Sequence, residues 1–303
     1  MTPLRLLFAI FFCTLLSVRA EETFEVRLHR PAKAGDRFRI AAKIAIESET
    51  STTFDKEDAD VEKVNAACKL TGELTAVTVT PKGLVSELKL KLTDVECVSD
   101  GAKVAFFKSG DVIHLRHDRD EKFVKVNGED PDELQGEVID DLLSVASDTE
   151  PTDDEVCGTK EKVALGAEWP MSSALAAKSW NEEGFEGMKA RDIKGSTKLV
   201  ETTTLDGQPA LRFRGEMKVN SSTMKMPRNP EETGEIKTKR FTMEASDDTE
   251  IPVDPTAMSS RVKLQVKIEA ESGGKIERDG ETVTVSVKTR HRYAYEIAET
   301  PVK

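Results

Sequence analysis

The chain has few aromatic residues and lacks the short motifs that mark most enzymes. Phe, Trp and Tyr together make up 5% of its 303 residues, and it has 4 histidines. It contains no Gly-x-Ser-x-Gly nucleophile turn, no phosphate-binding loop, no His-Glu-x-x-His and no Cys-x-x-Cys. No histidine stands beside a serine or cysteine arrangement suited to general acid-base chemistry. We therefore expect a protein that is not an enzyme and that needs no cofactor and no metal ion.

Positive charge is also in short supply. The chain has 44 Lys and Arg against 56 Asp and Glu, a net charge of -12. Residues 129–159 concentrate this excess, because they hold 12 acidic residues and no Lys or Arg. Nucleic acids and anionic membranes both select proteins with a net basic surface. The charge balance therefore argues against nucleic acid as a partner and against an anionic membrane as the main one.

The longest apolar run is too short to cross a membrane. It covers residues 6–16, whereas a spanning helix needs ~20 apolar residues. Arg5 precedes the run, and Val18 and Ala20 place small residues at the two positions that a signal peptidase reads. We predict a signal peptide over residues 1–20, cleavage after Ala20, and a secreted or periplasmic mature chain with no integral membrane span. An uncleaved membrane anchor is the alternative.

Cysteine is scarce after the leader. Cys68, Cys97 and Cys157 are an odd number, so at least one is left over or pairs between chains. A hairpin turning at Pro81-Lys82-Gly83 would set Cys68 beside residue 96 or 97. A disulfide between Cys68 and Cys97 is therefore geometrically allowed, with Cys157 as the free thiol. Three buried thiols are the alternative.

Alternation of apolar and polar residues is the strongest pattern present. Residues 283–297 alternate without a break, and residues 38–46, 88–92 and 262–268 repeat the pattern. Side chains turn to opposite sides at every residue only in an extended strand. The chain is therefore predicted to be mainly β, in the α+β class, with an antiparallel sheet that has one dry side and one solvated side.

Helical periodicity replaces the alternation in the middle of the chain. Asp130 can cap a helix, Pro131 suits its first position, and Glu133 is placed as a capping-box partner. These signals predict a helix over residues 131–146, and a second, weaker pattern predicts one over residues 172–182. The expected organisation is a signal peptide (1–20), an N-terminal β-rich half (21–128), an acidic helical connector (129–187) and a C-terminal β-rich half (188–303). The two halves form either one domain or two, and polar residues 48–60 are expected to form a loop.

The order of these elements resembles certain uncharacterised exported bacterial proteins. The similarity lies in an extended opening over residues 24–46 that is interrupted by Gly35-Asp36, a strand ending in Asn-Gly at 123–128, and a strand ending in Gly and Trp at 163–170. Such β-rich proteins are similar to periplasmic lipoprotein carriers. The resemblance implies a strongly curved antiparallel sheet, or half-barrel, closed by one or two helices around an apolar cavity. No functional residue is defined for the group.

A row of polar tips on the dry side of residues 283–297 is the candidate ligand site. His291 lies between Thr289 and Tyr293, and Tyr295 follows on the same side. Together with Phe213 and with Leu142 of the predicted helix, these residues are predicted to bind a ligand, because pockets combine apolar walls with a few polar groups. The alternative is a row near the rim of the sheet whose side chains hydrogen-bond to each other or to water.

The wet side of the predicted sheet is partly basic. The residues responsible are Lys89, Lys91, Arg212, Arg214, Lys263, Lys267, Lys288, Arg290 and Arg292. This surface could dock an anionic polymer or the acidic segment 129–159. The alternative is a solvated face whose alternating charges keep a one-sided sheet soluble.

Two function classes follow. The preferred hypothesis is a secreted or periplasmic, non-enzymatic protein that binds a lipid-like or other apolar small molecule in a half-barrel groove. The alternative is a structural or protein-interaction component of the cell envelope, partnered by another envelope protein, with no ligand cavity. An interior cavity above ~300 Å³ would favour the carrier. A carboxylate-based hydrolase would need two acids with raised pKa facing one cleft.

Overall fold

The computed structural model describes residues 22–55, 57–118, 121–182, 186–222, 224, 234–278 and 281–302. The predicted signal peptide over residues 1–20 lies outside the described residues. The strands are β1 (Thr23–Phe24), β2 (Arg37–Phe54), β3 (Asp60–Val79), β4 (Val85–Ser99), β5 (Ala102–Val104), β6 (Val112–Asp118), β7 (Glu121–Val126), β8 (Val163–Ala164), β9 (Glu168–Pro170), β10 (Ile193–Leu205), β11 (Gln208–Ser221), β12 (Gly234–Pro252), β13 (Ser260–Arg278) and β14 (Glu281–Pro301). The helices are α1 (Glu133–Leu142), α2 (Asp153–Val156), α3 (Ser173–Glu182) and the 3-10 turn η1 (Ala190–Asp192).

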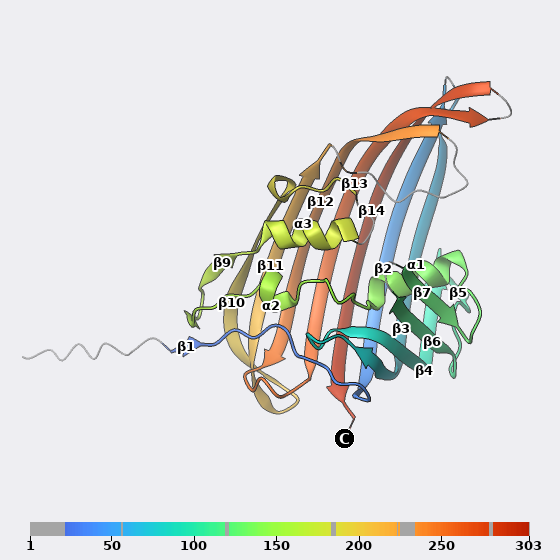
Figure 1. Cartoon of the computed structure of the whole chain (residues 1–303). Coiled ribbons are helices and arrows are strands. Elements are labelled where there is room, and N and C mark those ends of the chain that lie inside the picture. Colours follow the sequence, from blue (N-terminus) through green and yellow to red (C-terminus); the bar gives the residue numbers. More distant parts are fainter. Residues whose placement is uncertain are drawn as a thin grey trace, which may run out of the picture.

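One antiparallel sheet of 12 strands dominates the molecule (Figure 1). Its strand order is β7-β6-β4-β3-β2-β14-β13-β12-β11-β10-β9, with β5 attached to β4. The path has two free ends, β7 and β9, so the sheet is open rather than closed into a barrel. The predicted class, mainly β with an antiparallel sheet and covering helices, is confirmed.

The two β-rich halves of the chain share this sheet. The first long strand, β2, pairs with the last strand, β14, from Phe38 opposite Pro301 to Phe54 opposite Val285. Every other neighbouring pair of long strands comes from within one half. The boundary between the halves is therefore an ordinary antiparallel pairing in the middle of a continuous sheet.

The central strands are longer than the sequence indicated. The predicted loop over residues 48–60 is wrong, because β2 continues to Phe54 and β3 begins at Asp60. Thr50 and Thr52 of β2 lie opposite Thr289 and Val287 of β14. Threonine is a good strand former because its branched side chain suits a pleated surface. The polar composition of this segment reflects the surface it lies on, and the backbone remains extended.

Helix α1 is shorter than predicted. Its cap is Asp132, whose carboxylate accepts a hydrogen bond from the Gln135 backbone N–H at 2.8 Å, while the Gln135 side chain returns the contact to the Asp132 N–H. The predicted cap, Asp130, instead forms an ion pair with Lys125 at 2.7 Å. The second predicted helix is found as α3, Ser173–Glu182.

Helices α1, α2 and α3 lie on the same side of the sheet (Figure 1). We call this the covered side and the opposite one the open side. Apolar residues of the covered side form three clusters. The first joins α1 to β2, β3, β4 and β6, the second joins α3 to β10–β13, and the third joins the segment after β1 to β10–β12. The dry side predicted from the alternation is therefore the core.

The hairpin β3–β4 carries a disulfide. Cys68 and Cys97 are directly opposite in the register and are joined through their sulfurs. Cys157 is a free thiol. This is the pairing that the predicted hairpin allowed.

We expect the Cys68–Cys97 bridge to stabilise the fold by about 2–4 kcal/mol, because it limits the freedom of the unfolded chain. Replacing both cysteines with alanine should lower the free energy of unfolding by that amount, which urea denaturation will show as a lower midpoint. A Cys157→Ser variant is the control and should keep the bridge, which mass spectrometry of the non-reduced, alkylated protein will detect. Equal urea midpoints for the double alanine variant and the parent chain would contradict the expectation.

Candidate functional site

The predicted polar row of β14 lies on the covered side. Tyr295 and Tyr293 face Ile44 and Ile46 of β2 in the register. The His291 ring lies 5.4 Å from the Tyr293 ring at an interplanar angle of 57°. Burial lowers the pKa of His291 below its usual value of 6.5, which keeps the imidazole neutral at neutral pH. The structure therefore brings these three residues together on one half-buried row.

Of the two apolar residues predicted to line the same groove, Phe213 lies elsewhere and Leu142 lies in the cluster on which Tyr293 and Tyr295 pack. Phe213 is 1% exposed and packs edge to face on Trp169, with ring centroids 6.4 Å apart. It belongs to the third cluster, which joins the segment after β1 to β10–β12. Leu142 is buried in the α1 cluster. Tyr293 packs at the junction of the α1 and α3 clusters. Leu142 therefore shares a cluster with Tyr293 and Tyr295, whereas Phe213 belongs to a separate one, so the structure does not bring all five predicted ligand residues together.

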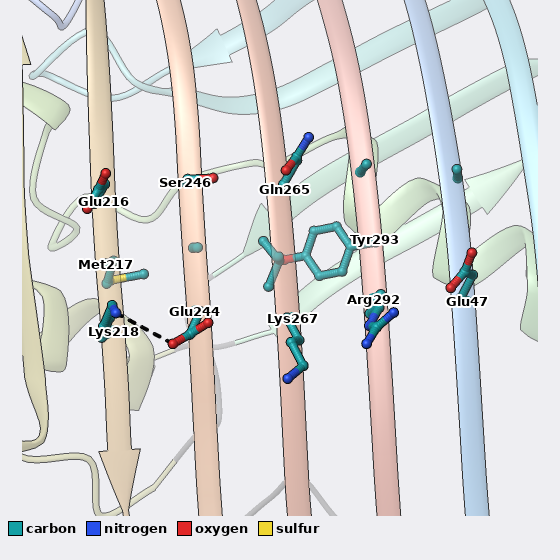
Figure 2. A pocket seen from close by; sticks show the side chains of 14 residues that line it. Glu47, Glu216, Met217, Lys218, Glu244, Ser246, Gln265, Lys267, Arg292 and Tyr293 are labelled. Atoms are coloured by element: carbon teal, nitrogen blue, oxygen red, sulfur yellow. Dashed lines mark ion pairs between the residues drawn. The ribbon is translucent and has the colours of Figure 1, made fainter.

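A hollow of about 530 Å³ opens on the other side of the sheet (Figure 2). In Figure 2 its labelled side chains come from five neighbouring strands, β11, β12, β13, β14 and β2, with the helices behind the strands. Ten exposed residues, at alternate positions along these strands, surround the hollow: Ala45, Glu47, Glu216, Lys218, Glu244, Ser246, Gln265, Lys267, Arg292 and Ala294. The residues between them along each strand point to the covered side. We call this feature the open-side hollow.

Charge and small side chains shape the open-side hollow. Ala45 and Ala294 are opposite each other in the register, and their short side chains leave space between longer neighbours. Lys218 pairs with Glu244 at 3.6 Å across the strands. Arg292 has no ion pair among the described residues. The hollow therefore offers charges of both signs and hydrogen-bonding groups around a floor that includes Met217, Val266 and Tyr293.

Sequence reasoning missed this hollow. Arg292 and Lys267 were recognised as wet-side residues, but their convergence with Ala45 and Ala294 depends on strands more than 200 residues apart in the chain. The available signal was the pair of small residues at otherwise charged wet-side positions. Without the register, that signal does not indicate which small residues become neighbours.

A second polar group lies on the covered side beside α2. Asp247 of β12 accepts a hydrogen bond from the Thr249 hydroxyl at 2.9 Å and lies over Gly215 of the neighbouring strand. A side chain at Gly215 would overlap the Asp247 carboxylate, so glycine is required there. The register at Gly215 is regular, and the irregularity between β10 and β11 lies between Leu199 and Glu201.

This group does not provide a nucleophile. Burial, with the nearby carboxylates of Asp153 and Asp247, raises the pKa of Cys157 to about 11, so the thiol is protonated at neutral pH. Burial also raises the pKa of Asp247. Among the described histidines, His114 bonds to Glu87 at 2.7 Å and His29 bonds to the Lys82 carbonyl at 2.9 Å.

The described residues contain no group of three or more His, Cys, Asp and Glu that could hold a metal ion. None of the helices in the described part of the chain is both long enough and apolar enough to cross a membrane.

Comparisons with known proteins add no family. Neither a family model nor a curated protein sequence matches the chain. Among solved structures, the crystal structure of the P. putida toluene transporter TodX aligns over 89% of this chain and 91% of that chain, with 7% sequence identity and a TM-score of 0.14. A TM-score this low carries no argument about fold or function.

The raised pKa of Asp247 makes a stability prediction. A carboxyl whose pKa is higher in the folded than in the unfolded chain lowers the free energy of unfolding when it ionises. This loss of stability is absent below the usual pKa of 3.8, and it grows as the pH rises to the pKa of Asp247 in the folded chain. Asp247→Asn stays neutral and keeps an oxygen for Thr249. The variant should be more stable than the parent chain at about pH 7, and the difference should vanish near about pH 3.5. Urea unfolding at both pH values checks this, and a variant that is less stable at about pH 7 would contradict it.

Proposed function

We propose that this protein is a non-enzymatic, protein-interaction component of the cell envelope that uses the open side of its sheet to dock a partner protein. One observation carries the proposal. The concavity lies among exposed charged residues of the open side, whereas Phe213 and Leu142, the two apolar residues predicted to line a groove, are buried in the core. A polar, charge-balanced hollow on a broad sheet suits the hydrogen-bonding surface of a protein.

Burial supports the assignment of the two sides to different tasks. Phe213, Leu90 and Ile113 on the covered side are each 1% exposed. Removing such side chains costs several kcal/mol, so they are committed to stability. The open-side residues around the hollow are exposed and free of such packing. They can change or bind without loss of the fold.

Binding of a lipid-like ligand stays a prediction, and a separate experiment tests it. Such a carrier would have to open the α1 cluster to admit a hydrocarbon chain, because Leu142, Leu143 and Val138 occupy that space. Organic extraction of the purified mature chain and titration with a fluorescent fatty-acid probe decide between the two functions. We expect no extracted lipid and no probe uptake, and saturable uptake would favour the carrier.

The docking role is tested by site-specific photo-crosslinking. A photoreactive residue at Gln265, inside the hollow, should give a discrete crosslinked product in native cells, and one at the exposed Asp148, beyond α1, should not. Adding Ser246→Arg fills the hollow and should lower the Gln265 product about tenfold, a loss equivalent to 1.4 kcal/mol. The same substitution should change the unfolding free energy by less than about 0.5 kcal/mol, since it is on the surface.

The control for Ser246→Arg is Ser196→Arg on β10, an exchange of the same type outside the hollow. Ser196 is on the same side of the sheet, opposite Glu216 of β11. Its variant should leave the Gln265 product unchanged. Equal crosslinking at Gln265 and Asp148, or no effect of filling the hollow, would rule out the docking role.

A further inference from the structure

Most of the acidic segment 129–159 lies on the opposite side of the sheet from the basic residues recognised in the sequence. The acidic segment 129–159 contains α1 and α2 and runs over the covered side, where Asp140 pairs with Lys122 and Glu155 with Lys82. The basic residues recognised in the sequence belong to strands whose charged residues point to the open side. Asp130 is an exception within the segment, because it pairs with Lys125 of β7 at 2.7 Å. Among the described residues, the segment forms no ion pair with Lys89 or Lys91.

One group of basic residues lies on the open side of the N-terminal half. A cross-strand row runs from Arg37 on β2 through Thr75 and Lys89 to His114 and Lys125 on β7, each residue opposite the next in the register. The adjacent row contains Arg39 on β2, Glu73 on β3 and Lys91 on β4. We define the basic patch as Arg37, Arg39, Lys89 and Lys91.

Three cations of the basic patch lack an acidic partner. Glu73 forms its ion pair with Arg37, His114 takes Glu87, and Lys125 takes Asp130. Arg39, Lys89 and Lys91 are exposed and form no ion pair within the part of the chain that the structure describes. Some open-side cations of the C-terminal half are paired, as where Arg212 binds both Glu201 and Asp248. Unpaired cations on a chain of net charge -12 are the feature to explain.

The spacing of the basic patch matches an extended peptide. Arg37 and Arg39 are two residues apart on β2, and Lys89 and Lys91 are two apart on β4, which places the charges in each pair about 6.7 Å apart. Alternate side chains of an extended peptide share this repeat. Strand β3 lies between the two pairs, so the pairs are about 10 Å apart across the sheet, the width of one strand with its side chains.

We propose that the basic patch binds an extended acidic segment of the partner protein, with Asp or Glu at alternate positions, laid along β3 between β2 and β4. This inference rests on the proposed docking function and names the chemistry of the partner. Carboxylates at positions i and i+2 would meet Lys89 and Lys91 on one side and Arg39 on the other. Electrostatic matching of this kind contributes mainly to specificity and to the rate of association.

The test is fluorescence anisotropy of a labelled peptide with the mature chain. The peptide alternates Glu and Thr over about eight residues, and its comparison peptide has the same composition with the Glu residues adjacent in pairs. We expect the alternating peptide to bind several-fold more tightly, with affinity falling between about 0.05 M and 0.3 M salt as charges are screened. Equal affinities for the two peptides would overturn the spacing argument.

Two matched variants locate the binding site. Lys89→Glu with Lys91→Glu should weaken the alternating peptide at least about tenfold. Lys194→Glu with Lys198→Glu makes the same charge change on β10, at exposed open-side positions far from the patch, and should change binding less than about twofold. Lys89→Gln with Lys91→Gln guards against a folding defect and should weaken binding with unchanged circular dichroism. Similar losses in both charge-reversal variants would overturn the proposal.

Other anions are alternative ligands of the basic patch, and the same assay tests them. Vesicles of anionic phospholipid or heparin that bind through Lys89 and Lys91, while the alternating peptide does not, would overturn the peptide in favour of that surface or polymer. Loss of peptide binding together with a retained Gln265 crosslink would leave the docking function standing and remove only the acidic-segment inference. Loss of the Gln265 crosslink with intact peptide binding would remove the docking function and leave only the affinity of the basic patch for an acidic peptide.

Discussion

The pairing of β2 with β14 is the constraint on which the rest of the structure depends. It places Ile44 beside Tyr295 and Ile46 beside Tyr293, and so decides which side chains from the two halves of the chain share the covered side. A slip of one residue would turn every side chain of one half to the wrong side. The pairing joins residues 38–54 to residues 285–301, so a large loop must close before its contacts stabilise anything. Once formed, it makes one sheet of two halves.

The helices depend on that sheet. Helices α1 and α3 each have 10 residues, a length at which an isolated helix in water is marginal, so packing on the covered side holds them. Tyr293 lies where the α1 and α3 clusters meet and links the two. The covered side is in this way committed to stability. The proposed function assigns binding to the open side, where the charged residues are exposed and the strands leave a hollow at the small residues Ala45 and Ala294.

Much of the fold could be read from the sequence, and the reasons are local. Alternation at 283–297 and 38–46 predicted long one-sided strands because side-chain direction in a strand follows from the backbone alone. The helix near 131–146 was predicted from its apolar spacing, but its cap was placed two residues early. Asp130 and Asp132 are equally good caps, and the ion pair of Asp130 with Lys125 comes from another strand. The loop at 48–60 was wrong because polar composition was given more weight than strand propensity.

The site could be predicted only in part. The sequence correctly put His291, Tyr293 and Tyr295 on one side of one strand, but it could not show that Phe213 and Leu142 would lie in separate clusters. By itself, the sequence determined the class of the fold, the side on which charge would lie and the acidic character of residues 129–159. The tertiary structure alone decided which strands are neighbours, and hence the hollow and the basic patch. The physical reason is that side-chain direction is set residue by residue, whereas strand order and register are set by contacts between distant parts of the chain.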